Sequence, residues 1–511
     1  MTVMPDSALH TDKRSMLFRL GLAALIAVLL WHIVEFIGYA RAVLFYPYQI
    51  DFGEGIVWQQ MRDMLAGSAY APLRVYPAVV YHYPPVYHLT SAAVSAALGI
   101  DQLVAGRIVS LFSTIATAIF AGLMTMRIVP DDRRIGMVGA IIAGLLFLNC
   151  YPVIVWGPLM RVDMLTGALG LAGMLVALQA ISRPRLIHVA ALLFTLSIFT
   201  KQISFAAPIA TFAILLLVVP KTALRGIASG LTMAFGALAL LLWLTDGRFL
   251  THILFYNVNR LAPDILVDVM LPQLRQYAAL ILIATIGAFT SWRSIRRKGL
   301  RTEPAAAMLL FFIGLKTVML LGMLKSGSSF NYMIEWFSGI AILAAIGLRP
   351  AFQLASGRPL GPLGIVSAAI MLGALTMQLA TTQMDLPTVE QAHRAAATHA
   401  ALVRRIAASP RPVISDDMAM IIRAGKKVQF ESAITAELGA AGLYDQPGFV
   451  RLIRARCFGF FVTDGNAGTP MFDRRYNPPV AAAMAAYYPK LEHSGKFVIH
   501  LPVDTTSTCP Y

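Results

Sequence analysis

The stretch MLFRLGLAALIAVLLWHIVEFIG, residues 16–38, is long and apolar enough to cross a lipid bilayer as a single helix. Shortly after it comes Asp51-Phe52-Gly53-Glu54-Gly55, which brings two carboxylates close to the membrane edge. Ionisable side chains at a bilayer are costly unless they face a cavity or take part in chemistry. We therefore take this acidic segment as the first lead to function.

The composition of the whole chain excludes an ordinary soluble protein. Of 511 residues, 58% are hydrophobic and only 13% are charged, which is typical of a polytopic membrane protein. Lys13, Arg14 and Arg19 precede the first apolar run, and no small-residue cleavage site follows it, so this run is expected to be a retained helix. The net charge of +16 is assigned to basic cytoplasmic loops facing anionic lipid. Nucleic acid is therefore not an expected partner.

Apolar runs of suitable length predict about eleven transmembrane helices. They cover residues 16–38, 105–127, 135–156, 164–181, 186–200, 203–219, 226–245, 276–291, 304–323, 331–348 and 361–380. The short basic connectors then fall on the same side as the N-terminus, which the positive-inside rule makes cytoplasmic. This count requires a hairpin turn at Lys201-Gln202, and it makes residues 85–98 an interfacial helix in a long first outer loop, residues 39–104. The C-terminus is then extracytoplasmic.

The character of the chain changes at about residue 381. Apolar runs shorten and charges return, which predicts a transmembrane domain over residues 1–380 and a small soluble α/β domain over residues 381–511. Strands are expected at residues 413–415, 427–430, 458–462 and 496–500. Cys457 and Cys509 both lie in this domain, where an extracytoplasmic location would permit a disulfide. Their spacing alone leaves the pairing open.

The predicted topology brings polar residues of five distant segments to the outer face. The candidate site residues are Asp51, Glu54, His82, Tyr83, Arg161, Asp163, Lys201, Gln202, Arg260, Asn331 and Tyr332. Displacing a phosphate from a sugar carbon needs a base for the attacking hydroxyl and a cation, or a metal, for the departing phosphate. Asp51 could be the base, and Lys201, Arg161 or Arg260 could stabilise the phosphate. No nucleotide-binding glycine motif is evident in the sequence.

The order of these motifs resembles the GT-C superfamily of polyprenyl-phosphate-sugar glycosyltransferases, especially its protein O-mannosyltransferase and lipid A aminoarabinose transferase branch. The similarity covers roughly residues 16–380. Five signals carry it: the acidic segment, Tyr83-Pro84-Pro85, Arg107, the pair Arg161 and Asp163, and Lys201-Gln202. One departure is that many relatives have two adjacent acids in the first loop, whereas Phe52 and Gly53 separate them here.

The resemblance implies an inverting transfer of a sugar from a polyprenyl phosphate to a hydroxyl of a glycan, lipid or protein. The reaction would take place on the outer side of the cytoplasmic membrane. By the same resemblance Asp51 activates the acceptor and Asp163 positions it, or both hold a divalent metal ion. Glu54 joins the catalytic candidates, although the separation of the two acids leaves its role open.

Simpler interpretations exist for each motif. Asp51 and Glu54 could be the N-cap and N3 residues of a helix capping box, at the start of an amphipathic surface helix. Arg161 and Asp163 could be a charge pair at a helix entrance, and Lys201 could reach the interface from a short helix. The aromatic residues near Tyr83 are equally suited to interfacial anchoring. At the level of function, a transporter or flippase of lipid-linked sugars and a non-catalytic assembly subunit remain the alternatives.

Overall fold

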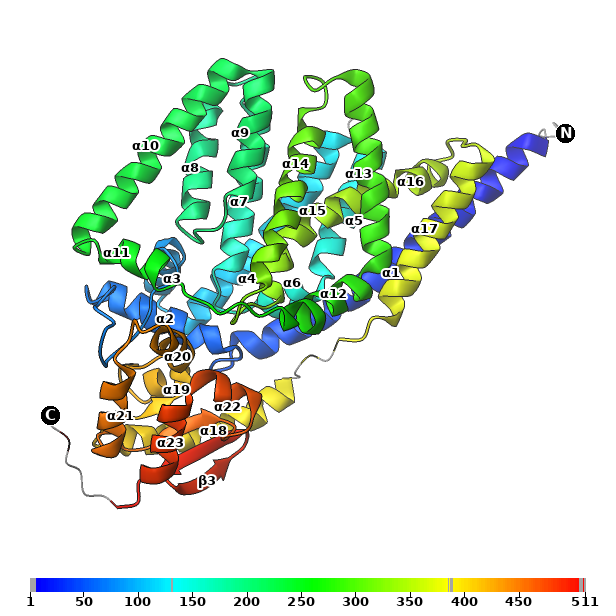
Figure 1. Ribbon diagram of the computed structural model, residues 1–511. Helices are drawn as coiled ribbons and strands as arrows, with labels where there is room; N and C mark the ends of the chain where they lie inside the picture. The colour runs from blue at the N-terminus through cyan, green and yellow to red at the C-terminus, as the bar shows by residue number, and fades with distance from the viewer. Residues whose placement is uncertain (1–5, 130–131, 385, 387–388, 505–508, 510–511) are drawn as a thin grey trace.

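A computed structural model describes residues 6–129, 132–384, 386, 389–504 and 509. In this part of the chain, seven helical segments are long and apolar enough to cross a membrane. They stand side by side with shorter helices in Figure 1. They are residues 13–44 of α1 (Asp6–Leu44), α4 (Gln102–Ile128), α10 (Pro220–Leu244), α13 (Ala278–Lys298), α14 with η3 (Pro304–Met319 and Leu320–Met323), η4 with α15 (Phe330–Met333 and Ile334–Gly347), and α17 (Pro362–Thr381). The prediction of a polytopic helical protein is confirmed.

Shorter helices complete the bundle. They are α5 (Arg133–Leu148), α6 (Tyr151–Trp156), α7 (Asp163–Gln179), α8 (Leu186–Ile198) and α9 (Ala206–Val218). The chain turns between α8 and α9 at Lys201, as predicted. The single helix predicted over residues 135–156 is wrong, because the side chain of Asn149 donates to the Leu145 carbonyl at 2.7 Å and α5 ends there. α6 then begins at Tyr151, and Pro152 lies in its first turn, where its missing N–H costs nothing. The total of eleven crossings stays a prediction.

The first loop contains two helices. A helix is present where an interfacial helix was predicted, as α3 (Val86–Leu98), and it packs against α2 (Phe52–Leu65) and α4. Its location at the membrane interface stays a prediction. Asp51 is the N-cap of α2, and its Oδ2 accepts the Gly53 N–H at 2.9 Å. Glu54 accepts from Ile50 N at 2.8 Å, one residue before the position that a capping box uses. The capping role predicted for Asp51 is thus real.

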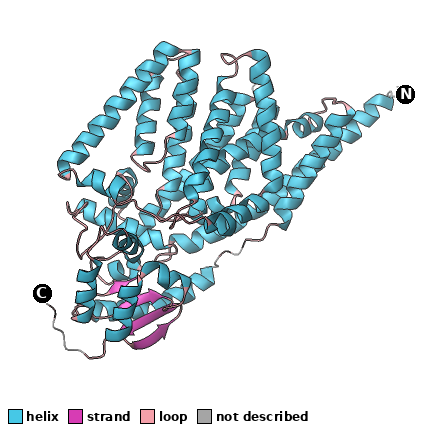
Figure 2. Cartoon of the chain, in the orientation of Figure 1, coloured by secondary structure: helices cyan, strands magenta, loops and turns pink. Residues whose placement is uncertain are grey.

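Short helices connect the bundle and complete the C-terminal part of the chain. They are α11 (Arg248–Leu250), η1 (Thr251–Phe255), η2 (Leu266–Met270), α12 (Leu271–Gln276), α16 (Arg349–Ala355), α18 (Val389–Ala408), α19 (Met418–Arg423), α20 (Ser432–Ala440), α21 (Gln446–Arg454), α22 (Pro470–Arg475) and α23 (Pro478–Tyr487). The last six surround a small sheet at one end of the helical bundle (Figure 2).

The sheet has four strands in the order β1-β2-β4-β3. β1 (Ile414–Ser415) runs parallel to β2 (Phe461–Asp464), and β4 (Phe497–Leu501) pairs antiparallel with β2 and β3 (Lys490–Ser494). The first and last strands match the prediction, whereas β2 begins later than expected. The predicted strand over residues 427–430 is wrong. This segment is not part of the sheet, because Phe430 forms an isolated bridge with Ala78 of the first loop instead. Sequence reasoning missed β3, which is exposed and polar at the sheet edge.

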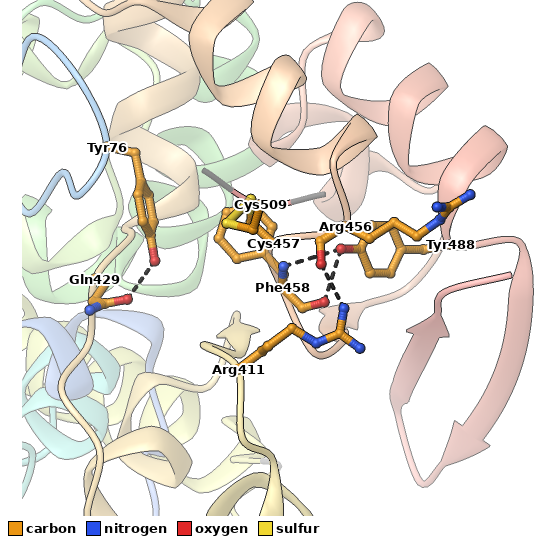
Figure 3. Close-up of a disulfide and its surroundings, with 8 residues drawn as sticks. All are labelled: Tyr76, Arg411, Gln429, Arg456, Cys457, Phe458, Tyr488 and Cys509. Carbon is orange, nitrogen blue, oxygen red and sulfur yellow. Dashed lines mark hydrogen bonds between the residues drawn. A yellow bond between two sulfur atoms is a disulfide. The ribbon is translucent and has the colours of Figure 1, made fainter. Parts of the chain in front are cut away.

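The C-terminal part docks on the first loop. Arg423 of α19 forms an ion pair with Asp101 at 2.6 Å and lies over the Trp58 ring at 4.6 Å. Tyr76 packs on Phe458 with ring centroids 5.3 Å apart. Figure 3 shows Tyr76 and Phe458 near the disulfide that Cys457 and Cys509 form. The pairing that the sequence left open is therefore present, and residues far apart in the chain share one core.

Candidate functional site

A cavity of about 200 Å³ lies between the helical bundle and the C-terminal part of the chain. Its wall includes three cations from three separate segments, Arg161, Lys201 and Lys325. The wall also includes polar and aromatic side chains, among them Gln60, His82, Tyr83, Gln202, Asn257, Asn259, Tyr332 and Glu431. Six of the eleven candidate residues line this cavity, namely His82, Tyr83, Arg161, Lys201, Gln202 and Tyr332. Asp51 and Asp163 are not in its lining and are connected to it through Arg161 and Lys201.

Arg161 connects the two aspartates of the candidate site. Its Nη1 donates to Asp51 Oδ2 at 2.8 Å, and its Nε lies 3.9 Å from Asp163 Oδ2. The second distance is too long for a hydrogen bond. Arg161 Nε and Asp163 Oδ2 are both buried, and neither has a hydrogen-bond partner among the described residues. Unpaired buried polar groups cost about 1–3 kcal/mol each, so a bridging atom from water or substrate would be stabilising here.

Gly53 makes the approach of Arg161 to Asp51 feasible. A Cβ atom at this position would lie 1.2 Å from Arg161 Nη1. No larger residue fits without moving the guanidinium away. The residues that separate the two acids of the first loop are therefore part of the site's geometry.

Asp163 begins α7 and is held by two more partners. Its Oδ1 accepts from Lys201 Nζ at 2.6 Å and from Asn331 Nδ2 at 2.9 Å. The Lys201 ammonium also lies 4.6 Å from the centroid of the Tyr332 ring, within cation–π range. Burial lowers the pKa of Lys201, but the Asp163 carboxylate more than offsets this, so the pKa is raised above its ordinary value. The ammonium is therefore charged at neutral pH.

Glu54 lies in a different environment from Asp51. It is fully buried and its carboxylate accepts from Arg107 Nε at 2.8 Å and Nη2 at 2.9 Å. The backbone N–H groups of Ile50 and Met160 donate to the same carboxylate, each at 2.8 Å. Burial raises the pKa of Glu54, and Arg107 with these N–H groups lowers it further than burial raises it. All of its acceptor capacity is used in holding the loop, and the cavity lining does not include it.

The remaining candidates divide between the cavity and its surroundings. His82 Nε2 donates to the Tyr256 carbonyl at 3.1 Å, and the His82 carbonyl accepts from Gln202 Nε2 at 2.8 Å. Burial lowers the pKa of His82 to about 4, so its ring is neutral at pH 7. Arg260 instead pairs with Glu437 at 3.1 Å, is largely exposed and does not line the cavity. The phosphate-binding role considered for Arg260 does not fit this placement.

Lys325, Asn257 and Asn259 lie in outer loops of the predicted topology, but they were not among the candidate site residues, and neither was Glu431. Lys325 belongs to the Lys325-Ser326-Gly327 turn and lines the cavity. The signal that the sequence offered for it was a cation in an outer loop that contains a glycine. It donates to Asn259 Oδ1 at 3.3 Å. Glu431 had no signal, because its segment was predicted to follow a strand of a separate domain.

The donor set does not fit a divalent metal ion. Among the described residues, no group of three histidine, cysteine, aspartate or glutamate side chains converges. Asp51 and Asp163 are already neutralised by Arg161 and Lys201. A divalent cation would have to compete with these resident cations.

Solved structures share this architecture. The chain is similar to ArnT from Cupriavidus metallidurans bound to undecaprenyl phosphate, with a TM-score of 0.57 and 14% identity over 93% of this chain and 99% of that one. It is also similar to the oligosaccharyltransferase AglB from Archaeoglobus fulgidus in complex with an inhibitory peptide and a dolichol-phosphate, with a TM-score of 0.54 and 10% identity over 94% of this chain and 74% of that one. Both are GT-C glycosyltransferases.

This chain has the GT-C fold. No protein-family model matches the sequence, and comparison with curated proteins also finds no match. At these identities the similarity establishes the GT-C fold, and the chemistry has to be argued from the site.

Proposed function

We propose that this protein is a membrane glycosyltransferase that moves a sugar from a polyprenyl phosphate to an acceptor hydroxyl. The observation that carries the proposal is the convergence of Arg161, Lys201 and Lys325 on one cavity, with Asp51 bonded directly to Arg161. Cations suit a departing phosphate, and an adjacent carboxylate suits proton removal from a hydroxyl. The undecaprenyl phosphate and dolichol-phosphate in the two similar structures support a lipid-linked donor.

In this mechanism Asp51 is the general base. Both hydrogen bonds that it accepts within the described residues use Oδ2, from Gly53 N and Arg161 Nη1. Oδ1 is then the oxygen that takes the proton of the acceptor hydroxyl. The acceptor oxygen attacks the anomeric carbon, and the bond from that carbon to the phosphate oxygen breaks. The phosphate leaves with the electron pair, and the configuration at the anomeric carbon inverts.

The cations of the cavity stabilise the leaving phosphate. Lys325 has no carboxylate partner within the described residues, so its charge is available to the phosphate. Arg161 has the additional task of orienting Asp51, and its unpaired Nε can bind a phosphate oxygen. Tyr83 and Tyr332 line the same cavity and offer ring faces to a sugar. The three cations supply the charge stabilisation that a divalent metal ion would otherwise provide.

We place the reaction on the outer side of the cytoplasmic membrane, with the N-terminus inside. The Cys457–Cys509 disulfide supports an oxidising location for the C-terminal part. The acceptor is a glycan, lipid or protein hydroxyl, all of which need the same base.

Asp51→Asn tests the proposal. Asparagine caps a helix about as well as aspartate and can still accept from Arg161, but it cannot take a proton. Transfer from a polyprenyl-phosphate sugar in nanodiscs should fall by about 10²–10⁴-fold, while thermal stability stays near that of the wild type. Near-normal turnover in the folded variant would remove Asp51 as the base. Lipid flipping by wild-type protein without glycosyl transfer would instead favour a transporter.

A further inference from the structure

The C-terminal part of the chain contributes a carboxyl group to the cavity. Glu431 lies in the cavity wall with Ala433 and Ile434 of α20. Its position is fixed relative to the first loop, because Glu431 N donates to the Ala78 carbonyl at 3.1 Å and Ala78 N donates to the Gln429 carbonyl at 2.8 Å. The carboxyl is thus part of the same wall as residues of the bundle, although it comes from a distant segment.

Glu431 is buried without forming an ion pair among the described residues. Only 3% of the residue is exposed, and its Oε1 accepts a long bond of 3.3 Å from Ile434 N as the N-cap of α20. Arg475 is engaged elsewhere, with Asp416 at 3.0 Å and over the Phe52 ring at 4.2 Å. Burial raises the pKa of Glu431 to about 8. The Ile434 N–H and the Arg475 guanidinium lower the pKa by less than burial raises it, so at pH 7 the group is mostly a carboxylic acid. A carboxylic acid can both donate and accept a hydrogen bond.

We propose that Glu431 is a specificity-determining residue that binds a hydroxyl group of the donor sugar. This inference rests on the proposed glycosyl transfer. Lys201 and Lys325 place the phosphate in the cavity, and the sugar attached to that phosphate must occupy the adjoining space. A hydroxyl group is also both donor and acceptor, so it matches a protonated carboxyl in a buried wall. An ammonium group of an amino sugar would require the ionised form instead.

The test compares the binding of two lipids by three variants. The probes are undecaprenyl phosphate and undecaprenyl phosphate carrying a neutral hexose, chosen from glucose, galactose and mannose as the one that the wild type binds most tightly. Glu431→Ser removes the carboxyl but can still cap α20, and Glu431→Gln keeps a neutral donor and acceptor. Glu437→Gln is the control, because Glu437 is on the same helix and does not line the cavity.

For Glu431→Ser we expect the affinity for the hexose-bearing lipid to fall by about tenfold or more, as for loss of one buried hydrogen bond. Its affinity for undecaprenyl phosphate should not change. Glu431→Gln and Glu437→Gln should keep both affinities within a few-fold of the wild type.

Three results would overturn the inference. Unchanged hexose-lipid binding by Glu431→Ser would remove the sugar contact, and equal losses for both lipids would show a structural role. A loss in Glu431→Gln as large as that in Glu431→Ser would show that an ionised carboxylate binds, which contradicts a hydroxyl partner. Failure of the wild type to bind either lipid would instead refute the proposed function itself.

Discussion

Replacing Glu54 with glutamine tests whether this carboxylate stabilises the first loop or takes part in catalysis. The substitution removes the charge that compensates Arg107, and both side chains are fully buried. It also turns one acceptor oxygen into an N–H₂ group that faces N–H donors, since Glu54 accepts from Arg107, Ile50 and Met160. Breaking a buried ion pair by changing one partner costs about 3–5 kcal/mol. For a chain of this length that corresponds to a fall of roughly 3–5 °C in melting temperature.

The assay is thermal unfolding in detergent, measured beside transfer activity, with Asp51→Asn as the matched control. Glu54→Gln should lose stability and retain activity in proportion to its folded fraction, whereas Asp51→Asn should lose activity and retain stability. A Glu54→Gln protein as stable as the wild type but inactive would refute this reasoning. Glu54 would then be a catalytic residue, as the sequence first suggested.

Four other perturbations test the remaining parts of the site. Lys325→Met should raise the KM for the donor by about tenfold, as for loss of one hydrogen bond to a charged group, and should leave thermal stability unchanged. Lys201→Met should lower both donor use and thermal stability, because it leaves the buried Asp163 carboxylate without its cation. Equal thermal stability of the two variants would contradict the buried ion pair. Gly53→Ala should displace the Arg161 guanidinium and abolish most glycosyl transfer. Normal transfer by this variant would show that the Arg161–Asp51 contact is not required. EDTA should leave the initial rate of transfer unchanged, and a loss restored by Mg²⁺ or Mn²⁺ would show that a metal ion takes part.

Much of the cavity could be predicted from the sequence because topology constrains it. Loops on one side of a membrane must share a small area, so Asp51, Arg161 and Lys201 could be grouped without coordinates. What could not be predicted was which side chains are already paired. Glu54 and Asp51 have the same chemistry and are close in sequence, yet the first is enclosed by Arg107 and the second is partly exposed.

Residues from the C-terminal part were harder to foresee. The segment at Gln429 and Phe430 has a β-strand pattern, and the pattern does not say that its partner is Ala78 rather than another strand of the sheet. Long-range pairing of this kind depends on how two cores meet, and local propensity carries no information on it. Glu431 was missed for the same reason.

The bridge between Ala78 and Phe430 also bears on how the protein is made. Residue 78 is synthesised early and residue 430 late, so the wall of the cavity is completed only after the intervening helices have been made. During insertion, Asp51 and Arg161 can already be neighbours while the cavity is still open toward Glu431. The cavity is therefore the last part of the protein to be assembled, and a partly inserted chain lacks its complete wall.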